Sequence, residues 1–295
     1  MADRAQTHVS PRDLAAAIDA SESSVKRWAD EGLLAVHRTS GGHRRISIAE
    51  AIRFVRQSNV RVLRPDMLGL PDFASNAGRL VTADHLAELF RRHASGDVVG
   101  LIQQGFVDGF SVAEICEGPI RESLEIVGRL CEVDELGIAI EHGAVDACVD
   151  GLSSLRRLLH SPHAEITAIG GAVEGDPYML ASLSVALVLA ESGYRVLNFG
   201  PNTPLEALLP VIVEQQGRLI WRSYGIDLTL SQREAEVERL TPLASAGIDV
   251  VVGGRALQPI ELMPEGIHAF GSLTELSEFA QTRIASLEPE RAKTA

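Results

Sequence analysis

Cysteine is scarce in this chain of 295 residues, and long apolar runs are absent. The three cysteines, Cys116, Cys131 and Cys148, show no C-x-x-C spacing and are too few for a disulfide framework. No apolar run approaches the roughly 18 residues that a membrane helix needs. The N-terminal stretch, MADRAQTHVSPRD, lacks the apolar segment of a signal peptide. We therefore expect a soluble, cytoplasmic protein.

Signatures of the common enzyme classes are also missing. The sequence contains no P-loop, no G-x-S-x-G and no H-E-x-x-H motif. Its nine histidines do not show the spacing of a zinc site. The composition, 45% hydrophobic and 23% charged, is typical of globular domains and excludes disordered, collagen-like and coiled-coil chains. These observations predict a protein without catalytic residues or a metal site, folded into two or three domains.

Charge is distributed unevenly along the chain. Residues 1–64 carry 11 Lys and Arg against 7 Asp and Glu, a net charge of +4. The remaining residues carry 16 against 33, a net charge of −17. A small basic domain joined to an acidic body is typical of a nucleic-acid-binding segment attached to a second function.

The basic segment, residues 1–64, has the pattern helix, turn, helix, ribbon, helix. Ser10-Pro11 suits the start of the first helix, because Ser caps a helix and Pro fits its first position. Gly41-Gly42 tolerates the positive φ of a turn between two short extended arms. Ser47-x-x-Glu50 reads as a capping box that opens the last helix. These features predict a small DNA-binding domain.

The rest of the chain changes from a helical to an alternating pattern. Residues 65–79 contain Pro and Gly that interrupt any helical period, so we expect a linker. Residues 80–160 show four amphipathic helices with short connections, which predicts a four-helix bundle. Residues 161–288 alternate five short apolar runs with helices, which predicts a five-stranded parallel, doubly wound (flavodoxin-like) sheet. A tail at 289–295 completes a multidomain α and α/β protein.

The candidate DNA-binding residues lie on the second helix and on the ribbon. A helix fits the major groove of B-DNA, where Lys and Arg reach phosphates or guanine edges. A glycine-tipped ribbon flanked by Arg reaches the neighbouring backbone or minor groove. The candidates are Ser23, Ser24, Lys26, Arg27, His37, Arg38, His43, Arg44 and Arg45.

The segment from Val9 to Asn59 resembles the winged helix-turn-helix of the MerR family. The resemblance is carried by Arg27-Trp28, by Glu31-Gly32-Leu33-Leu34 and by the ribbon from Arg38 to Arg45, which reads RTSGGHRR. Trp28 stands where the family usually has a tyrosine-rich segment. The resemblance implies a transcription regulator that binds promoter DNA as a dimer or larger oligomer.

The order of bundle and α/β domain resembles the cobalamin-binding module, which CarH-type light-sensing repressors join to a MerR head. The family's pattern is Asp-x-His-x-x-Gly, then Ser-x-Leu or Ser-x-Thr, then Gly-Gly, and the His is the lower axial ligand of cobalt. Here Asp176 and Ser223 match, as does Gly253-Gly254, but Tyr178 replaces the axial His and Ala181 replaces the Gly. Asp176-Pro177 equally fits plain helix initiation, with Asp as N-cap.

The bundle matches the same family in part. CarH-type proteins carry a Trp ten residues before a Glu-His pair, which cover the adenosyl face of the cofactor. Glu141-His142 is present, but Cys131 occupies the Trp position. The ligand-binding residues that the resemblance implies are Cys131, Glu141, His142, Gly171, Asp176, Tyr178, Ser223, Gly253 and Gly254.

Three hypotheses follow. The first is a MerR-type regulator whose cobalamin-fold body senses a ligand or oligomerises, its cofactor lost or changed. The second is an adenosylcobalamin-dependent light-sensing repressor. The third is a corrinoid carrier of a methyltransferase system. The expected partners are double-stranded DNA, further copies of the chain and a small-molecule ligand. If cobalamin is lost, either a different ligand occupies the crevice or Tyr178 and Trp221 fill it.

Overall fold

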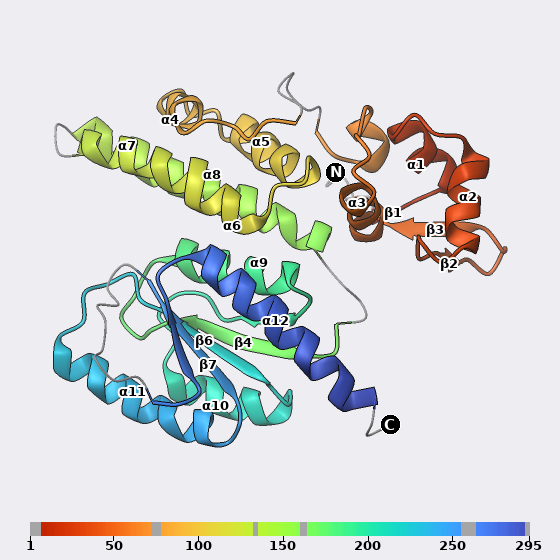
Figure 1. Ribbon diagram of the computed structural model, residues 1–295. Helices are drawn as coiled ribbons and strands as arrows, with labels where there is room; N and C mark the ends of the chain where they lie inside the picture. The colour runs from red at the N-terminus through yellow and green to blue at the C-terminus, as the bar shows by residue number, and fades with distance from the viewer. Residues whose placement is uncertain (1–6, 72–77, 132–134, 160–163, 255–263, 293–295) are drawn as a thin grey trace. The chain divides into compact units, whose positions relative to one another are not determined.

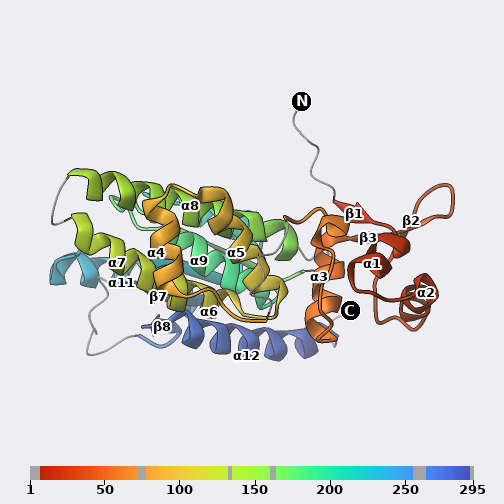
Figure 2. The same ribbon diagram turned by 90° about the horizontal axis from the view of Figure 1, so that it is seen from above.

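The computed structural model describes residues 7–71, 78–131, 135–159, 164–254 and 264–292. It divides into two compact units, residues 1–161 and residues 162–295 (Figures 1 and 2). In the described residues no helix combines the length and the apolar character needed to cross a membrane.

The first unit opens with three short helices and a three-stranded antiparallel sheet, which we call the head (residues 7–59). The strands lie in the order β1-β3-β2, so β3 is central. The elements in chain order are β1 (His8–Val9), α1 (Pro11–Ala17), α2 (Glu22–Asp30), β2 (His37–Arg38), β3 (Arg44–Ser47) and α3 (Ile48–Gln57).

Local sequence determines most of the head's boundaries. Ser10 caps α1, with Pro11 at the first helical position, as expected. Gly42, at φ +78°, makes the turn of the ribbon. Ser47 caps α3 by accepting a hydrogen bond from the Glu50 amide, at 3.2 Å. The capping box also predicts that the Glu50 side chain accepts from the Ser47 amide, and this prediction is wrong. The Glu50 carboxylate accepts instead from the amide of Ala35, which precedes the ribbon, at 2.6 Å.

The segment that we expected to be a linker begins with folded structure. The amides of Leu63 and Arg64 both donate to the Ala17 carbonyl of α1. A 3-10 helix, η1 (Pro65–Leu68), follows, and its Pro65 and Leu68 are buried. The chain after α3 is therefore packed onto the head as far as Leu68.

A group of helices completes the first unit. The helices α4, α5, α7 and α8 pack against one another, and α5 packs closely on α8 because Gly151 leaves room for Ile102. A Cβ at Gly151 would lie 2.4 Å from the Ile102 Cδ1 atom. The elements are α4 (Ala83–Arg91), α5 (Ser95–Val107), α6 (Val112–Ile115), the π-helix η2 (Cys116–Ile120), α7 (Arg121–Cys131) and α8 (Glu135–Leu159).

The second unit is a five-stranded parallel sheet covered by helices on both faces. Its strand order is β5-β4-β6-β7-β8, the doubly wound order expected from the sequence. The elements are β4 (Thr167–Ala172), α9 (Met179–Glu191), β5 (Arg195–Asn198), α10 (Leu205–Glu214), β6 (Leu219–Ser223), α11 (Leu230–Ser245), β7 (Asp249–Gly253), β8 (Ile267–Phe270) and α12 (Leu273–Ala292). Because α12 continues to Ala292, helix extends into the expected tail at 289–295.

Alternation along each strand determines which helices cover each face. Ile220 of β6 and Tyr224, the residue after this strand, point into an apolar core with α10 and α11, which also contains Ile169 of β4. Trp221 and Ser223, at the alternate positions, point toward the opposite face. On that face the Trp221 indole Nε1 donates to the Ser182 Oγ atom of α9, at 3.4 Å. The face covered by α10 and α11 is thus packed mainly with aliphatic side chains, whereas the face covered by α9 contains the polar contact of Trp221 with Ser182.

A buried charge lies on the α10 and α11 face of the sheet. The Arg222 side chain is only 1% exposed, and its Nε atom lies 3.1 Å from Oε1 of Glu236 on α11. Its Nη1 atom donates to the carbonyl oxygen of Thr203, at 2.8 Å. Glu236 also pairs with Arg239, which in turn pairs with Glu206 of α10. This network ties β6 to both covering helices.

Removing one partner of this pair leaves an uncompensated charge in the core. We expect Glu236→Ala to lower the free energy of unfolding by about 3–5 kcal/mol. The exposed Glu238, on the same helix, is the control, and Glu238→Ala should change stability by less than about 0.5 kcal/mol. In a Trp28→Phe background the remaining tryptophan, Trp221, belongs to the second unit, so urea denaturation followed by fluorescence reports on that unit. Equal stability of the two variants would show that Arg222 does not depend on Glu236.

Candidate functional site

The exposed face of α2 carries the first group of predicted DNA-binding residues. Ser21 caps the helix, and its hydroxyl also hydrogen bonds with those of Ser23 and Ser24, at 2.7 and 2.8 Å. Lys26 and Arg27 are exposed and make only surface ion pairs, with Glu22 and Glu31 respectively. Such exposed pairs contribute little and separate easily when a stronger anion arrives. Both cations are therefore available to a partner.

The ribbon is joined to α2 by Arg44. Its Nη2 atom lies 2.6 Å from Oδ1 of Asp30, and its Nη1 atom donates to the Lys26 carbonyl oxygen, at 2.9 Å. The Arg44 side chain is only 18% exposed. The sequence placed Arg44 among the residues that contact DNA directly, whereas here it bridges β3 and the end of α2. Arg44 therefore fixes the position of the ribbon beside the helix.

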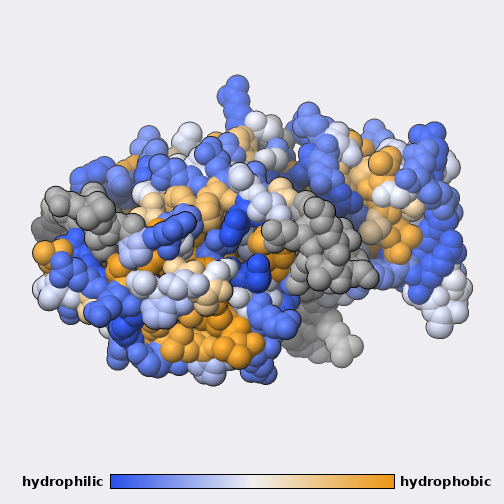
Figure 3. Space-filling model, turned by 60° about the horizontal axis from the view of Figure 1, so that its bottom comes forward, coloured by the Kyte–Doolittle hydropathy of each residue, from blue (hydrophilic) through white to orange (hydrophobic). Residues whose placement is uncertain are grey.

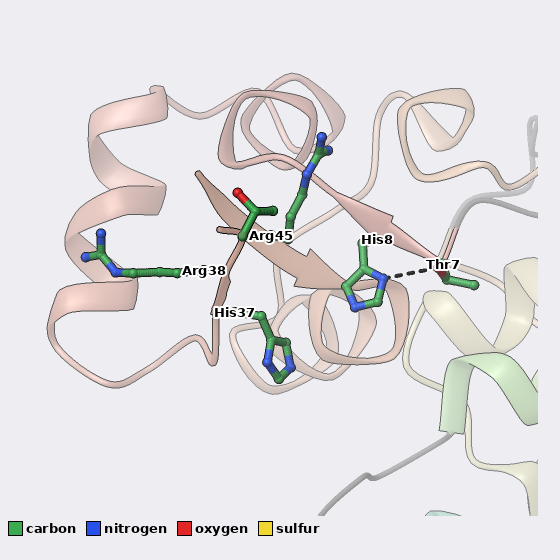
Figure 4. Close-up of a pocket in the computed structure, with 6 residues that line it drawn as sticks. Thr7, His8, His37, Arg38 and Arg45 are labelled. Atoms are coloured by element: carbon green, nitrogen blue, oxygen red, sulfur yellow. Dashed lines mark hydrogen bonds between the residues drawn. The ribbon is translucent and has the colours of Figure 1, made fainter. Parts of the chain in front are cut away.

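A pocket of about 400 Å³ opens on the head's sheet (Figure 4). His37 pairs with Arg45 across the β2–β3 ladder, and His8 pairs with Ser47 across the β1–β3 ladder, so all four positions share one face. The rings of His8 and His37 meet edge to face with centroids 6.1 Å apart. The lining residues are Thr7, His8, His37, Arg38, Thr39 and Arg45. Sequence reasoning missed Thr7 and His8, because a two-residue strand leaves no periodic signal.

The remaining ribbon candidate, His43, lies at the turn. It is exposed, and its amide donates to the Thr39 Oγ1 atom, at 3.2 Å. It is absent from the residues that line the pocket. The structure therefore brings His37 and Arg45 onto one face of the ribbon, places Arg38 on the other face at the rim of the pocket, and leaves His43 apart.

In the second unit, a row of small residues crosses the carboxyl edge of the sheet. Ala172 of β4 pairs with Ser223 of β6, and Ser223 pairs with Gly253 of β7. The row lies on the α9 face, two residues beyond Trp221. The Ser223 Oγ atom is buried and has no hydrogen-bond partner. Because a buried hydroxyl is normally satisfied, Ser223 is a candidate hydrogen-bonding group for a ligand at this edge.

The glycines predicted at this edge have structural reasons of their own. A Cβ at Gly171 would lie 2.8 Å from the Gly200 carbonyl oxygen, and one at Gly253 would lie 2.9 Å from the Phe270 carbonyl oxygen. Gly254 has φ +130°, and a Cβ there would lie 2.3 Å from the Tyr224 carbonyl oxygen. Each glycine is thus required by close approach of the backbone, whether or not a ligand binds.

Asp176 ties two loops of this edge together. Its carboxylate is fully buried and accepts hydrogen bonds from the amides of Gly225, at 2.5 Å, and Tyr178, at 2.9 Å. The alternative of Asp176 as N-cap is wrong, because α9 begins at Met179 with Tyr178 as its N-cap residue. Asp176 therefore connects the loop after β4 to the end of β6.

The two aromatic residues expected in the crevice behave differently. Trp221 is 1% exposed and its ring lies against Gly170, where a Cβ would be 2.4 Å from the Cδ2 atom. Tyr178 is 57% exposed, so the expectation that it fills the crevice is wrong. It lies instead at the surface, and Met179, the next residue, and Phe199, which follows β5 at the same edge of the sheet, are also exposed. Together they give the edge an apolar rim.

These residues do not fit cobalamin in its His-ligated form. Tyr178 offers a phenol, a poor cobalt ligand at neutral pH, where the family pattern has an imidazole. The indole of Trp221 fills the space over Gly170 on the α9 face. In the described residues no three His, Cys, Asp or Glu side chains form a group that could hold a metal ion. In the part of this edge that the structure describes, the Ser223 hydroxyl is buried without a hydrogen-bond partner.

The remaining ligand candidates belong to the first unit. Glu141 is half-buried and His142 is exposed on α8, and Ile138, one turn before His142, is also exposed. The side chain of Cys131 lies outside the described residues. Of the other two cysteines, both buried, Cys148 has its pKa raised to about 12 by burial, which keeps it an unreactive thiol.

Comparison with known proteins gives a fold but no family. No family model matches the chain, and no curated protein matches it. Among solved structures, the monomethylamine corrinoid protein of Methanosarcina barkeri is 16% identical, with a TM-score of 0.53, and the match covers 67% of this chain and 96% of that protein. At this identity the likeness shows a shared fold.

Two further structures match with lower scores. The methanol:cobalamin methyltransferase complex MtaBC of Methanosarcina barkeri is 17% identical over 78% of this chain and 91% of that chain, with a TM-score of 0.38. A cobalamin-binding protein of Desulfitobacterium hafniense is 13% identical over 68% of this chain and 98% of that one, with a TM-score of 0.36. The shared fold is shown by the monomethylamine corrinoid protein, whose match has the TM-score of 0.53.

Proposed function

We propose that this protein is a DNA-binding transcription regulator of the MerR type, without enzymatic activity. The observation that carries the proposal is the contact of Arg44 with Asp30 and with the Lys26 carbonyl, which joins the ribbon to α2. Two elements that expose cations, Lys26 and Arg27 on α2 and Arg45 on the ribbon, thereby form one surface, as a winged helix-turn-helix requires. In the proposed complex α2 enters the major groove, and the ribbon contacts the adjacent backbone.

The body is proposed to act as a sensor or an assembly module. Its corrinoid-protein fold supports a ligand at the carboxyl edge of the sheet, where Ser223 has an unsatisfied hydroxyl. The exposed rim of Tyr178, Met179 and Phe199 favours a flat, partly apolar ligand. Figure 3 shows apolar areas on the surface, and α10 exposes Leu209 and Val213. Such exposed apolar side chains support assembly with further copies of the chain.

Two alternatives keep the cofactor. A corrinoid carrier is favoured by the fold of the monomethylamine corrinoid protein. This function would need a cobalt ligand, and it does not explain the DNA-binding residues of the head. A light-sensing repressor with adenosylcobalamin is favoured by Glu141-His142 in the bundle, yet it faces the same substitution at Tyr178. The cationic head therefore favours the regulator.

Mutation should distinguish a residue that contacts bases, Arg27, from a residue that holds the ribbon in place, Arg44. We expect Arg27→Ala to cost about 1–3 kcal/mol of DNA-binding free energy and to relax sequence preference, because Arg27 is exposed on the proposed recognition helix. The measurement is selection of bound duplexes from a random-sequence pool, with Arg91→Ala on α4 as the control. An Arg27→Ala protein that selects the wild-type sequences with wild-type affinity would contradict the assignment of α2.

Arg44→Ala should act in another way. Because Arg44 holds the ribbon against α2, its loss should weaken binding to all sequences alike, and Asp30→Ala should reproduce much of this effect. Binding isotherms at two salt concentrations, on selected and unselected duplexes, test both variants. If Asp30→Ala binds as the wild type does while Arg44→Ala is impaired, Arg44 contacts DNA directly.

The cofactor prediction follows from Tyr178. The purified protein mixed with adenosylcobalamin should not show the absorption spectrum of cobalt ligated by a histidine nitrogen. Tyr178→His should gain some of this spectrum, whereas the control Tyr178→Phe should not. Tight binding by the wild type, with a nitrogen-ligated spectrum, would restore the light-sensing or carrier function and would assign the ligand role to another histidine.

A further inference from the structure

The exposed face of α2 carries acids among its cations. Residues four apart on a helix lie one above the other, so Glu22, Lys26 and Asp30 form one row. All three are exposed. Because Arg44 of the ribbon pairs with Asp30, this row is the one beside the ribbon. The side of α2 next to the ribbon therefore alternates acid, base, acid.

The two acids of this row differ in what they hold together. The Asp30 carboxylate, at the end of α2, lies 2.6 Å from Arg44, so its charge serves the position of the ribbon. Glu22 is the first residue of α2, and its Oε1 atom lies 2.7 Å from Nζ of Lys26 in an exposed pair that adds little stability. The start of the helix is already capped by Ser21. The fold therefore depends little on Glu22, whose side chain is 44% exposed.

A carboxylate on a DNA-binding face is unfavourable unless it meets a hydrogen-bond donor. Phosphates repel it, and an ionised carboxylate offers only acceptor positions, about four of them. In the complex proposed above, α2 lies in the major groove, where the N-terminal residues of a recognition helix contact base edges. Guanine presents the acceptors N7 and O6 there and thymine the acceptor O4, whereas the N4 amino group of cytosine is a donor. Adenine combines a donor with an acceptor, so cytosine fits the Glu22 carboxylate best.

We propose that Glu22 is a specificity-determining residue, whose carboxylate accepts a hydrogen bond from the N4 amino group of one cytosine in the major groove. The proposal rests on the DNA-binding function proposed above and adds a base preference to it. The ion pair with Lys26 holds Oε1 of the carboxylate and leaves it acceptor positions for the base. The same negative charge lowers the affinity of the head for duplexes that lack the cytosine.

Selection of duplexes by the full chain from a random-sequence pool identifies the base pair that Glu22 contacts. The wild type should select a C·G pair at this position, and Glu22→Ala should accept any base pair there while its other preferences stay unchanged. Glu22→Gln should shift the preference toward A·T, because an amide side chain pairs with adenine N6 and N7. The control is Glu31→Gln, just past the other end of α2, where Glu31 pairs with Arg27 across 3.8 Å. It removes the same charge and should keep the C·G preference.

A modified base tests the hydrogen bond itself. On the selected duplex, the contacted cytosine is replaced by 2-pyrimidinone, which lacks the 4-amino group. The wild type should lose roughly 5- to 150-fold in affinity, the range of a good base contact, whereas Glu22→Ala should lose much less. Because the weaker base pair affects both proteins alike, the difference between their losses isolates the contact.

The charge of Glu22 gives a second readout. Glu22→Gln and Glu22→Ala each remove a negative charge that phosphates repel, so both should bind unselected duplexes several-fold more tightly than the wild type. A purely structural role of Glu22 in α2 would instead weaken binding to every duplex. Circular dichroism checks that the variants are folded.

The outcomes separate the role of Glu22 from the DNA-binding function. If the wild type binds DNA with a sequence preference that Glu22→Ala and Glu22→Gln retain at every position, the role of Glu22 is overturned and the DNA-binding function stands. An equal loss for the wild type and Glu22→Ala on the modified duplex overturns the hydrogen bond to cytosine, as does relaxation at an A·T pair. A full chain that binds no duplex overturns both.

Discussion

The arrangement of the head depends on the interaction of Arg44 with α2. A two-stranded ribbon of six residues has little burial of its own, and its position is fixed by what it touches. Arg44 provides this contact through Asp30 and the Lys26 carbonyl, while Glu50 holds the chain before the ribbon through the Ala35 amide. Helix and ribbon consequently present Arg27, Arg38 and Arg45 on fixed elements, and fixed elements lower the entropy that binding would otherwise lose.

The structure of the second unit depends on close contacts between backbone segments and on buried hydrogen bonds at the carboxyl edge of its sheet. Asp176 joins the loop after β4 to the end of β6, and the glycines at 171, 253 and 254 allow strands and loops to come close. These contacts maintain the fold that the second unit shares with a corrinoid protein. Tyr178 lies at the surface of this edge, and Trp221 fills the space over Gly170. A fold of this kind can keep its shape while its ligand changes.

Much of the architecture was predictable from local signals. The caps at Ser10 and Ser47 and the strand–helix alternation after residue 164 predicted elements that the structure contains. Contacts between distant residues left no such signal. Asp176 accepts a hydrogen bond from the amide of Gly225, which lies 49 residues later in the sequence. The strand β1 has two residues and is recognised in the structure by its pairing with β3. For the same reason His8 was missed and Arg44, which looks like any ribbon arginine in the sequence, was assigned a direct contact. The side-chain direction of Tyr178 depends on where α9 starts. The Asp176-Pro177 pair predicted a start earlier than the observed one at Met179.

If the head is a cationic surface for double-stranded DNA, its binding to DNA must depend strongly on salt. Contacts to several phosphates release counterions, so affinity should fall steeply as salt is added. With four or more contacts, the dissociation constant of the full chain on a duplex should increase by roughly a hundredfold or more between 50 and 200 mM salt. Failure to bind any duplex at 50 mM salt, or binding that does not respond to salt, would contradict the account.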